Sequence, residues 1–521
     1  MHYILIILIV LSGSVFAADP ETEFGQQFLE RQKQERERQY LENKQENLQV
    51  IPTSPDLPSE DVCFDIENIQ INGNTLLNQQ DILFVLEKYR GQCLGKNGVN
   101  YLMQDLTAVY VQKGYITTRV YIPPQDLNLG TLKLIVIEGE VEGVILNDGE
   151  ESDSRKLWWA MPSLSKELFL PDIEQGLDQI NRVRSASATM KLWPGSEPGL
   201  TKIQIVNQTD DEFRGEVELN NDGQEDTGKT KVRVGLEADN ILGINDSTSI
   251  NYIGSQNTNA LAATASFPYR YSSFNFSHSY SEYLNILPEQ TDLFGQSNTS
   301  TFSWDYLLFR DSSMRVNLVN SLSVRRSERY LLGVKLSPQK IVPYRVSINV
   351  SENLPWGYYS MELAAAHGSK WFGATSDPSQ LPDSAPHAQF SKVEWRSSIA
   401  KSVTSLGSYQ VSLNGQYSDK GLYSSEQVHI GDRSSVRGGE TTIASGDSGF
   451  YIRNDFNINV PAAGLRQIGV SIRPSVFIDY GHVFADENSI GEEATGGDSV
   501  SMQAINVFGY SLFGHISLIP A

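Results

Sequence analysis

The stretch Val428-His-Ile-Gly-Asp-Arg-Ser-Ser-Val-Arg-Gly-Gly-Glu440 places one arginine, Arg437, between a turn of small residues and a strand. A second stretch, Ser475-Val-Phe-Ile-Asp-Tyr-Gly481, places one aspartate, Asp479, inside an otherwise apolar strand. A lone carboxylate in such a strand needs a partner, and a guanidinium pairs with it best because it donates two parallel hydrogen bonds. The two stretches therefore supply a candidate guanidinium–carboxylate pair, Arg437 with Asp479.

The chain around both stretches, from Phe213 to the end, shows almost no helical pattern. Apolar and polar residues alternate over about ten residues at a time between Gly, Asn, Asp and Ser turns, which is typical of a transmembrane β-barrel. In Lys231–Ala238, for example, the apolar side chains share one face and the charges share the other. A soluble sandwich gives the same alternation, but one of roughly 300 residues would normally split into domains. The pattern predicts a mainly β fold with a 16-stranded barrel over 213–521.

The same alternation assigns faces to the second stretch. Val476, Ile478 and Tyr480 share the parity that faces lipid, so Phe477, Asp479 and Gly481 face the lumen. Arg437 reaches Asp479 if the loop over 428–448 folds back into the barrel. Arg453 and Arg473 are alternative partners.

The composition limits the possible functions. The chain has 521 residues and a formal net charge of -22, and this acidity argues against nucleic-acid binding, which requires clustered Lys and Arg. The mean hydropathy of -0.31 is compatible with a barrel that keeps polar residues in a wet lumen. The seven histidines show no metal-binding spacing, and no phosphate-binding loop or GxSxG motif occurs. We therefore expect no enzyme activity, no cofactor and no metal site.

The N-terminal region is expected to contain three segments before the first domain. Residues 1–17 have the apolar core and small residues of an export signal peptide. Residues 19–47 interleave Glu with Arg or Lys at helical spacing, which indicates a helix that is polar all round, either solvated or placed as a plug in a wet lumen. Residues 48–61 contain three prolines and indicate an extended linker.

Two compact α+β units follow, over 62–139 and 140–208. The first shows the order strand, helix, helix, strand, strand, and the second is less regular. Cys63 and Cys93, the only cysteines, both lie in the first unit. A disulfide in an oxidising compartment is predicted, because neither cysteine has a nearby His or a CxxC neighbour for metal binding.

These motifs together resemble one family, the outer-membrane transporters of two-partner secretion. This family includes haemolysin activators, adhesin exporters and contact-dependent inhibition transporters. Val436-Arg-Gly-Gly439 is similar to its Val-Arg-Gly-aromatic loop motif, and Phe477-Ile-Asp-Tyr-Gly481 to its Phe-x-Asp-x-Gly strand motif. Gly114–Leu127 resembles its first POTRA domain, in which a cysteine pair is also common. Position 439, where the family has an aromatic residue, is glycine here.

The resemblance implies a fold and a site. The fold is a polar plug helix, two POTRA domains and a barrel whose loop over 428–448 folds inward. The site is a bridge from Arg437 to Asp479 that locks this loop, with Val436, Gly438, Phe477 and Gly481 supporting the motif. After its Phe-x-Asp-x-Gly strand the family usually has three more strands. This chain has room for two, expected over 500–512 and 513–519, so the barrel is either complete with a redistributed strand or lacks its last one.

The resemblance also implies a function and its partners. The protein is expected in the bacterial outer membrane, as a monomer, with its POTRA domains in the periplasm. It would capture a large unfolded exoprotein, a haemolysin, adhesin or contact-dependent toxin, and export it to the cell surface. Outer-membrane lipid and the barrel-assembly machinery are the other expected partners. The alternatives are an insertase for outer-membrane proteins, which would more often carry additional POTRA domains, and a passive porin, which would carry none.

Overall fold

The computed structural model describes residues 60 to 518 with ten internal gaps. The gaps are 148, 150, 163–165, 222–227, 288–290, 404–406, 432–434, 438–443, 459–469 and 485–503. The predicted signal peptide and plug helix, nearly all of the predicted linker, and Gly438 lie outside the described residues, and these predictions stay predictions.

The first α+β unit contains a three-stranded sheet, a two-stranded sheet and two α-helices. In the larger sheet the order is β2-β5-β4, with β2 parallel and β4 antiparallel to β5. Helix α4 packs Leu102, Leu106 and Tyr110 onto Leu132 and Leu134 of β5, and all five side chains are buried. The elements are β1 (Phe64–Ile66), β2 (Asn68–Asn72), α3 (Gln79–Leu86), β3 (Gln92–Leu94), α4 (Lys96–Gln112), β4 (Arg119–Tyr121), η1 (Leu127–Leu129) and β5 (Thr131–Ile137).

A disulfide and a charged cap hold the start of this unit. Cys63 is bonded to Cys93, beside the short antiparallel pair of β1 and β3. The Glu60 carboxylate accepts hydrogen bonds from the backbone N–H groups of Gly95, Asn97 and Gly98 at the N-terminus of α4, at 2.8–3.0 Å. These N–H groups, Asn97 first, lower the pKa of Glu60 because they stabilise its ionised form. The chain that enters the unit is thus fastened at two points.

The second unit is joined closely to the first. Its sheet order is β6-β8-β7, and Ile203 and Ile205 of β8 are buried against Ile173 and Ile180 of α6. The Leu170 N–H donates to the Gly114 carbonyl of the first unit at 2.9 Å. A side chain at Gly114 would meet Phe169 at 2.9 Å, so glycine is needed there. The elements are β6 (Glu140–Leu146), α5 (Glu151–Ala160), α6 (Leu170–Ile180), β7 (Ala186–Pro194) and β8 (Leu200–Thr209).

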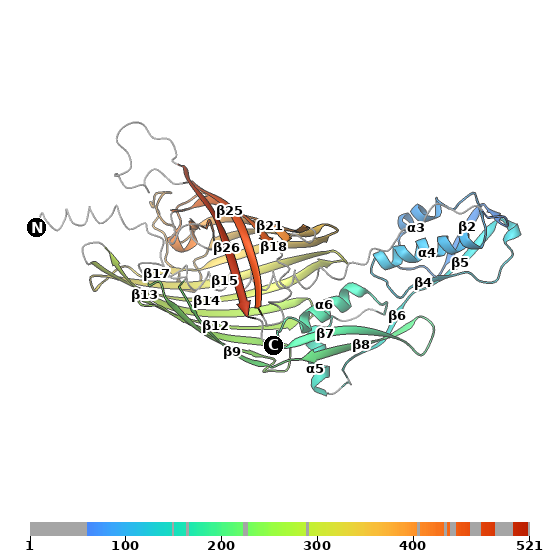
Figure 1. Cartoon of the computed structure of the whole chain (residues 1–521), viewed down its shortest axis with the longest axis horizontal. Coiled ribbons are helices and arrows are strands. Elements are labelled where there is room, and N and C mark those ends of the chain that lie inside the picture. The colour runs from blue at the N-terminus through green and yellow to red at the C-terminus, as the bar shows by residue number, and fades with distance from the viewer. Residues whose placement is uncertain are drawn as a thin grey trace, which may run out of the picture.

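Most of the remaining described chain forms one antiparallel sheet of sixteen strands that curls into the barrel, and the two units extend from one end of it as an arm (Figure 1). β16 (Val334–Lys335) and β17 (Gln339–Ile341) are short pieces that pair with β15, so a count of sixteen spanning strands stays a prediction. The path consists of β9 (Phe213–Asn220), β10 (Lys231–Asp239), β11 (Ser247–Gly254), β12 (Thr258–Tyr269), β13 (Ser272–Leu287), β14 (Thr291–Arg310), β15 (Met314–Leu331), β18 (Pro343–Leu354), β19 (Gly357–Gly368), β20 (Ser391–Val403), β21 (Gly407–Ser418), β24 (Ser448–Ile458), β25 (Val470–Phe484) and β26 (Ala504–Leu518).

The two faces of this sheet differ in polarity, as the alternation predicts. In β11, Ile250 and Tyr252 are exposed on the outer face, whereas Ser249 and Asn251 are buried on the inner one. In β25 the side chain of Ile478 is 64% exposed and that of Asp479 is 0% exposed. The outer face therefore suits lipid, and the inner face gathers hydroxyl, amide and charged groups. Among the described residues, no helix is both long and apolar enough to cross a membrane.

The expectation of two strands after the Phe477–Gly481 motif is wrong. Residues 504–518 form one strand, β26, which pairs with β25 from Phe484 opposite Ala504 to Val470 opposite Leu518. The expectation assumed strands of about ten residues, the length that just crosses a membrane. In this sheet β13, β14 and β15 have 16, 20 and 18 residues. The alternation through residues 512 and 513 therefore continues one long strand without a turn.

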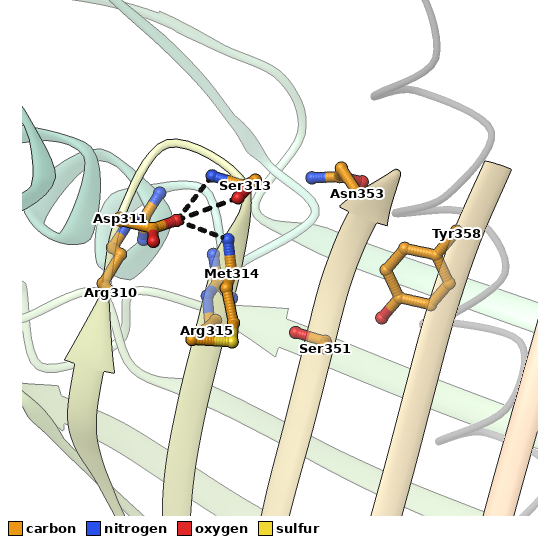
Figure 2. A pocket seen from close by; sticks show the side chains of 8 residues that line it. All are labelled: Arg310, Asp311, Ser313, Met314, Arg315, Ser351, Asn353 and Tyr358. Atoms are coloured by element: carbon orange, nitrogen blue, oxygen red, sulfur yellow. Dashed lines mark hydrogen bonds between the residues drawn. The ribbon is translucent and has the colours of Figure 1, made fainter. Parts of the chain in front are cut away.

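The second unit docks on the sheet through helix α6 and the turn between β14 and β15. Figure 2 shows this turn, in which the Asp311 carboxylate accepts hydrogen bonds from the Ser313 N–H at 2.8 Å and the Met314 N–H at 2.7 Å. Arg310 and Arg315 flank the turn and lie directly opposite each other in the register of β14 with β15. Both reach Asp178 of α6, and Arg310 also binds Glu174 of the same helix at 3.0 Å. The helix carboxylates thus neutralise two adjacent arginines and fix the arm to the barrel.

The disulfide is expected to stabilise the first unit. In the double variant Cys63→Ser with Cys93→Ser, the free energy of unfolding of this unit should fall by about 3–4 kcal/mol, because the unfolded chain regains a loop that the bond closes. Limited proteolysis of the full chain over a urea gradient measures the change, with reduced wild-type protein as the matched control. An unchanged urea midpoint in both samples would contradict the prediction.

Candidate functional site

The segment between β21 and β24 folds against the inner wall of the barrel. Its short strands β22 (Val428–Ile430) and β23 (Ala444–Gly446) form an antiparallel hairpin that contacts β24 and β25. Ile430, Val436 and Ala444 are buried there against Val483 of β25. Because Val483 has the inward parity of Asp479, the hairpin lies on the lumen side of the wall. An apolar contact therefore holds this loop inside the barrel.

Gly481 makes room for the loop. A Cβ atom at this position would lie 2.6 Å from Cγ2 of Val436 and 3.3 Å from two carbon atoms of Ile430. Val436 is β-branched and has little freedom to turn away. The glycine at the end of the strand motif and the valine at the start of the loop motif are therefore in direct contact. The two motifs do not reveal this contact by themselves.

Arg437 meets Asp479 with the geometry of a bidentate pair. The Nε atom of Arg437 donates to Oδ2 of Asp479 at 2.7 Å, and Nη2 donates to Oδ1 at 2.8 Å. The backbone N–H of Arg437 donates to the same carboxylate at 3.1 Å. The guanidinium also stacks on Phe477, with Cζ 3.9 Å from the ring centroid. The structure thus brings Arg437, Phe477 and Asp479 together, with Val436 and Gly481 adjoining them.

Two residues of β24 that neither motif contains complete this cluster. Asp455 is a second carboxylate partner of Arg437, and the Asn454 backbone N–H donates to Asp479 at 3.3 Å. The register of β24 with β25 runs through Ile452 and resumes at Asp455. Asp479 thus accepts a backbone N–H group at the point where the two strands skip two pairings, at Arg453 and Asn454 of β24. The signal was present in the polar run Arg453-Asn-Asp455, but only the register places it opposite the motif.

The two alternative partners of Asp479 lie on β24 and β25. Arg453 is on β24, within the interrupted stretch of the register between Ile452 and Asp455. Arg473 is on β25 itself, opposite His515 of β26.

A second charged anchor holds the same loop before its hairpin begins. The Glu426 carboxylate lies between Arg325 of β15 and Lys392 of β20, 3.0 Å from a nitrogen atom of each. The three side chains are 3–8% exposed. The Lys392 ammonium also donates to the Glu426 carbonyl at 3.0 Å, and Arg325 donates to the Ser425 carbonyl at 3.1 Å. The loop is therefore fixed to two distant strands of the wall.

The anchor continues as an alternating row of charges along the inner wall. Lys392 pairs with Glu394 of the same strand at 2.9 Å, and Glu394 binds Arg345 of β18 at 2.7 Å. Arg345 in turn binds Glu362 of β19. Each buried charge thus has an opposite neighbour, as charges away from bulk water require. The sequence does not reveal this row, because its members lie on three different strands, β18, β19 and β20, that become neighbours only when the sheet forms.

The loop's two legs are also tied to each other and to the preceding loop. Asp447, next to β23, accepts hydrogen bonds from the Leu422 N–H at 2.8 Å and from the Gln427 side chain at 2.9 Å. The His387 N–H, in the segment before β20, donates to the Gly421 carbonyl at 2.9 Å. The described residues contain no group of three or more His, Cys, Asp or Glu side chains arranged to hold a metal ion. The site is thus built of ion pairs and backbone hydrogen bonds.

Comparison with known proteins assigns this architecture to a family. Residues 199–504 match the haemolysin secretion/activation protein family ShlB/FhaC/HecB. Residues 64–139 match the ShlB-type POTRA domain, and residues 140–194 match a further POTRA domain description. The chain belongs to the ShlB/FhaC/HecB family of haemolysin secretion/activation proteins. It is accordingly an outer-membrane transporter of two-partner secretion whose POTRA domains lie in the periplasm.

Individual relatives and structures agree with this assignment. The outer membrane transporter CdiB of Dickeya dadantii is 33% identical over 86% of this chain and 83% of its own length. The hemolysin transporter protein ShlB of Serratia marcescens is 31% identical over 89% of this chain and 83% of its own length. The solved structure of CdiB from Escherichia coli is 26% identical, has a TM-score of 0.83, and is matched over 95% of this chain and 92% of that one.

The close contact between Gly481 and Val436 can be tested by a substitution that adds a single methyl group at position 481. In Gly481→Ala the new Cβ collides with Val436, so the hairpin should separate from the wall while the charges of the site remain. Hydrogen–deuterium exchange of the full chain should then be faster in peptides covering 428–446. Gly215→Ala is the matched control, because its Cβ would meet nothing closer than 3.6 Å. Equal exchange in the two variants would refute the fit.

The Glu426 anchor can be tested through stability. Glu426→Gln removes the carboxylate between two buried cations, which should destabilise the barrel by roughly 3–5 kcal/mol because Arg325 keeps its charge without a counter-ion. The temperature at which the detergent-solubilised protein loses its folded mobility on a gel measures the loss. Lys335→Gln, which breaks an ion pair whose lysine side chain is 45% exposed, should leave that temperature nearly unchanged. A similar shift in both variants would show that the burial of the Glu426 anchor is unimportant.

Proposed function

We propose that this protein takes up a large exoprotein from the periplasm in an unfolded state and passes it through the barrel lumen to the cell surface. The observation that carries the proposal is the loop held inside the barrel by the bidentate bond from Arg437 to Asp479. A porin that only admits small solutes would carry no POTRA domains, whereas this chain has two beside the barrel that holds the loop. A loop that obstructs the lumen and can be released suits a polypeptide channel.

The two POTRA domains would capture the client by strand addition. Within the described residues, β2 and β4 are the outer strands of the first sheet, and β6 and β7 are those of the second. An outer strand has unpaired backbone N–H and C=O groups, and an extended guest segment pairs with them largely regardless of its sequence. A client must be unfolded to use such an edge, and the same extended form passes through a barrel.

The loop bonds act as a latch in this proposal. The Arg437 and Glu426 anchors hold the loop in the lumen at rest, and both must yield or move together when a chain passes. These ion pairs are buried while the loop is in place, but when the loop leaves the wall, water and the charged groups of a passing chain replace the partners that are lost. Directional folding of the client outside the cell supplies the driving force, since no ATP is available at this membrane. No catalysis is involved.

The client is proposed to be a large secreted protein, a haemolysin, an adhesin or a contact-dependent toxin. The Serratia marcescens relative is named a hemolysin transporter, which supports this class of client. We further propose that the transporter works as a monomer in outer-membrane lipid and reaches it through the barrel-assembly machinery. The Cys63–Cys93 bond would form in the periplasm during that passage.

The test is secretion of the large exoprotein that we expect to be encoded beside this chain. A host that expresses both proteins should release client to the surface or medium, and Asp479→Ala should reduce this release strongly because the loop loses its latch. Arg326→Gln is the control, because it removes an arginine whose side chain is 60% exposed, and secretion should continue. Normal secretion by Asp479→Ala would remove the latch from the proposal and leave the channel standing.

The same experiment separates the exporter from an insertase. If wild-type protein is folded in the outer membrane and the client stays in the periplasm, the export function is wrong. Depleting the transporter then shows whether other outer-membrane proteins accumulate unfolded. Such accumulation identifies an insertase, whereas an exporter leaves those proteins unaffected.

A further inference from the structure

Aromatic side chains gather on the outer face of the barrel near its periplasmic end. They come from the ends of β12, β13 and β14 that lead into the periplasmic turns, and they share the parity of the exposed Phe276 and Phe302. Neighbouring rings are in contact, for example Phe267 with Phe274 at 5.2 Å between centroids. Outer-membrane barrels carry such girdles at the level of the lipid headgroups. The members are Phe267, Tyr269, Phe274, Trp304 and Tyr306.

Helix α5 of the second POTRA domain extends this girdle beyond the barrel. The Trp159 ring lies 5.6 Å from that of Tyr269 and 6.1 Å from that of Phe267, and Trp158 lies 5.7 Å from Tyr269. The Arg270 N–H, in the turn after β12, donates to the Trp159 carbonyl at 2.8 Å. Trp158 remains 54% exposed. A periplasmic domain thus presents a tryptophan at the same level as the barrel's own interfacial aromatics.

The turn between β10 and β11 adds apolar surface beside this helix. Ile241 and Leu242 are 55% and 61% exposed, although both lie in a periplasmic turn. The turn is fastened to α5, because the Asn245 side chain donates to the Lys156 carbonyl at 2.9 Å and Arg155 donates to the Leu242 carbonyl at 3.4 Å. Helix α5 of the second POTRA domain and the β10–β11 turn of the barrel therefore form one continuous surface of aromatic and aliphatic side chains.

Cationic groups border the aromatic and apolar part of this surface. The Arg270 guanidinium lies 5.6 Å from the Trp158 ring centroid and 5.3 Å from that of Tyr269. Arg155 is exposed on α5. Two acids near this surface bind partners within the protein: Asp246 accepts from the Leu242 N–H at 2.9 Å and Asp172 from the Tyr271 hydroxyl at 2.6 Å. Arg155 and Arg270 thus give the described part of this apolar surface a cationic border.

We propose that α5 and the β10–β11 turn form a docking surface for phospholipids of the periplasmic leaflet of the outer membrane. Trp158, Ile241 and Leu242 would lie at the boundary between headgroups and acyl chains, and Arg155 and Arg270 would face the phosphates. Continuity with the lipid-facing girdle favours lipid as the occupant, and so does the positive border, because the headgroup phosphates are anionic. The inference needs only the outer-membrane location of the barrel, so it stands or falls separately from the export proposal.

This lipid contact has a mechanical consequence. The contacts of α6 with Arg310 hold the second POTRA domain at one side, and the lipid contact of α5 holds it at another. A domain held at two separated points resists tilting. The periplasmic arm is then kept in one orientation to the lumen while a client is handed from one domain to the next.

The test measures the depth of a probe on α5. The two native cysteines form a disulfide, so a cysteine introduced by Trp158→Cys is the one thiol available for a polarity-sensitive fluorophore. The full chain is reconstituted into phosphatidylethanolamine and phosphatidylglycerol vesicles, and nitroxide-labelled lipids are compared with aqueous iodide as quenchers. Trp193→Cys is the matched control. Trp193 is also 54% exposed, but it lies at the far end of β7 from the contact of Ser185 with Asp239 at the barrel.

The proposal predicts that nitroxides at the headgroup and upper acyl chain quench the probe at 158 and that iodide does not, with the reverse at 193. Leu242→Cys gives an independent second probe on the turn, which should behave like 158 and carries the test if the tryptophan variant does not fold. Quenching of 158 and 242 by iodide alone would overturn the proposal. Lipid quenching at 193 as well would also overturn it, because the whole domain rather than this surface would then lie on the membrane.

Discussion

A strand that crosses the membrane must satisfy its backbone hydrogen bonds with its neighbours, because lipid offers no partners. The continuous ladder from β9 to β26 meets this requirement within the described residues, and it forces side chains to alternate between lipid and lumen. Charges are then confined to the inner wall, where Asp479, Lys392 and Glu394 are found. The loop that enters the lumen is held by these charges, so the site is a consequence of how the wall is built.

The loop is fastened at two places by the same kind of contact. Arg437 meets a carboxylate with no exposed surface, and Glu426 lies between two cations that are almost as buried. Each contact combines charge with backbone hydrogen bonds, so its strength depends on the loop's conformation as well as on its charges. Such contacts hold one conformation firmly and lose most of their value when the loop moves as a unit. That behaviour suits a gate with two defined positions.

The periplasmic arm follows a similar logic at its junction with the barrel. Arg310 and Arg315 lie side by side because the register pairs them, and this arrangement is tolerable only because α6 brings Glu174 and Asp178 to them. On the other side, aromatic rings of α5 and β12 meet at the level of the membrane interface. The domain is thus oriented by charge on one side and by aromatic contact with the barrel on the other, which connects the handling of a client to the position of the lumen.

Much of this protein was determined by its sequence alone. Period-two alternation over a region too long for one sandwich specified the barrel, and the alternation specified the faces of its strands, because one face meets lipid and the other meets water. The cysteine pair specified the disulfide because the chain has no other cysteine, and the two short motifs implied the Arg437–Asp479 contact through their resemblance to a known family. Tertiary structure decided the rest. Asp455 and Asn454 join the site through the register of β24, and Glu426 finds Arg325 and Lys392 across three separate segments. The long strand β26 was also missed, since strand length depends on how far the sheet tilts and extends beyond the membrane. Contacts between distant segments leave no local pattern, because they depend on which strands become neighbours when the sheet curls.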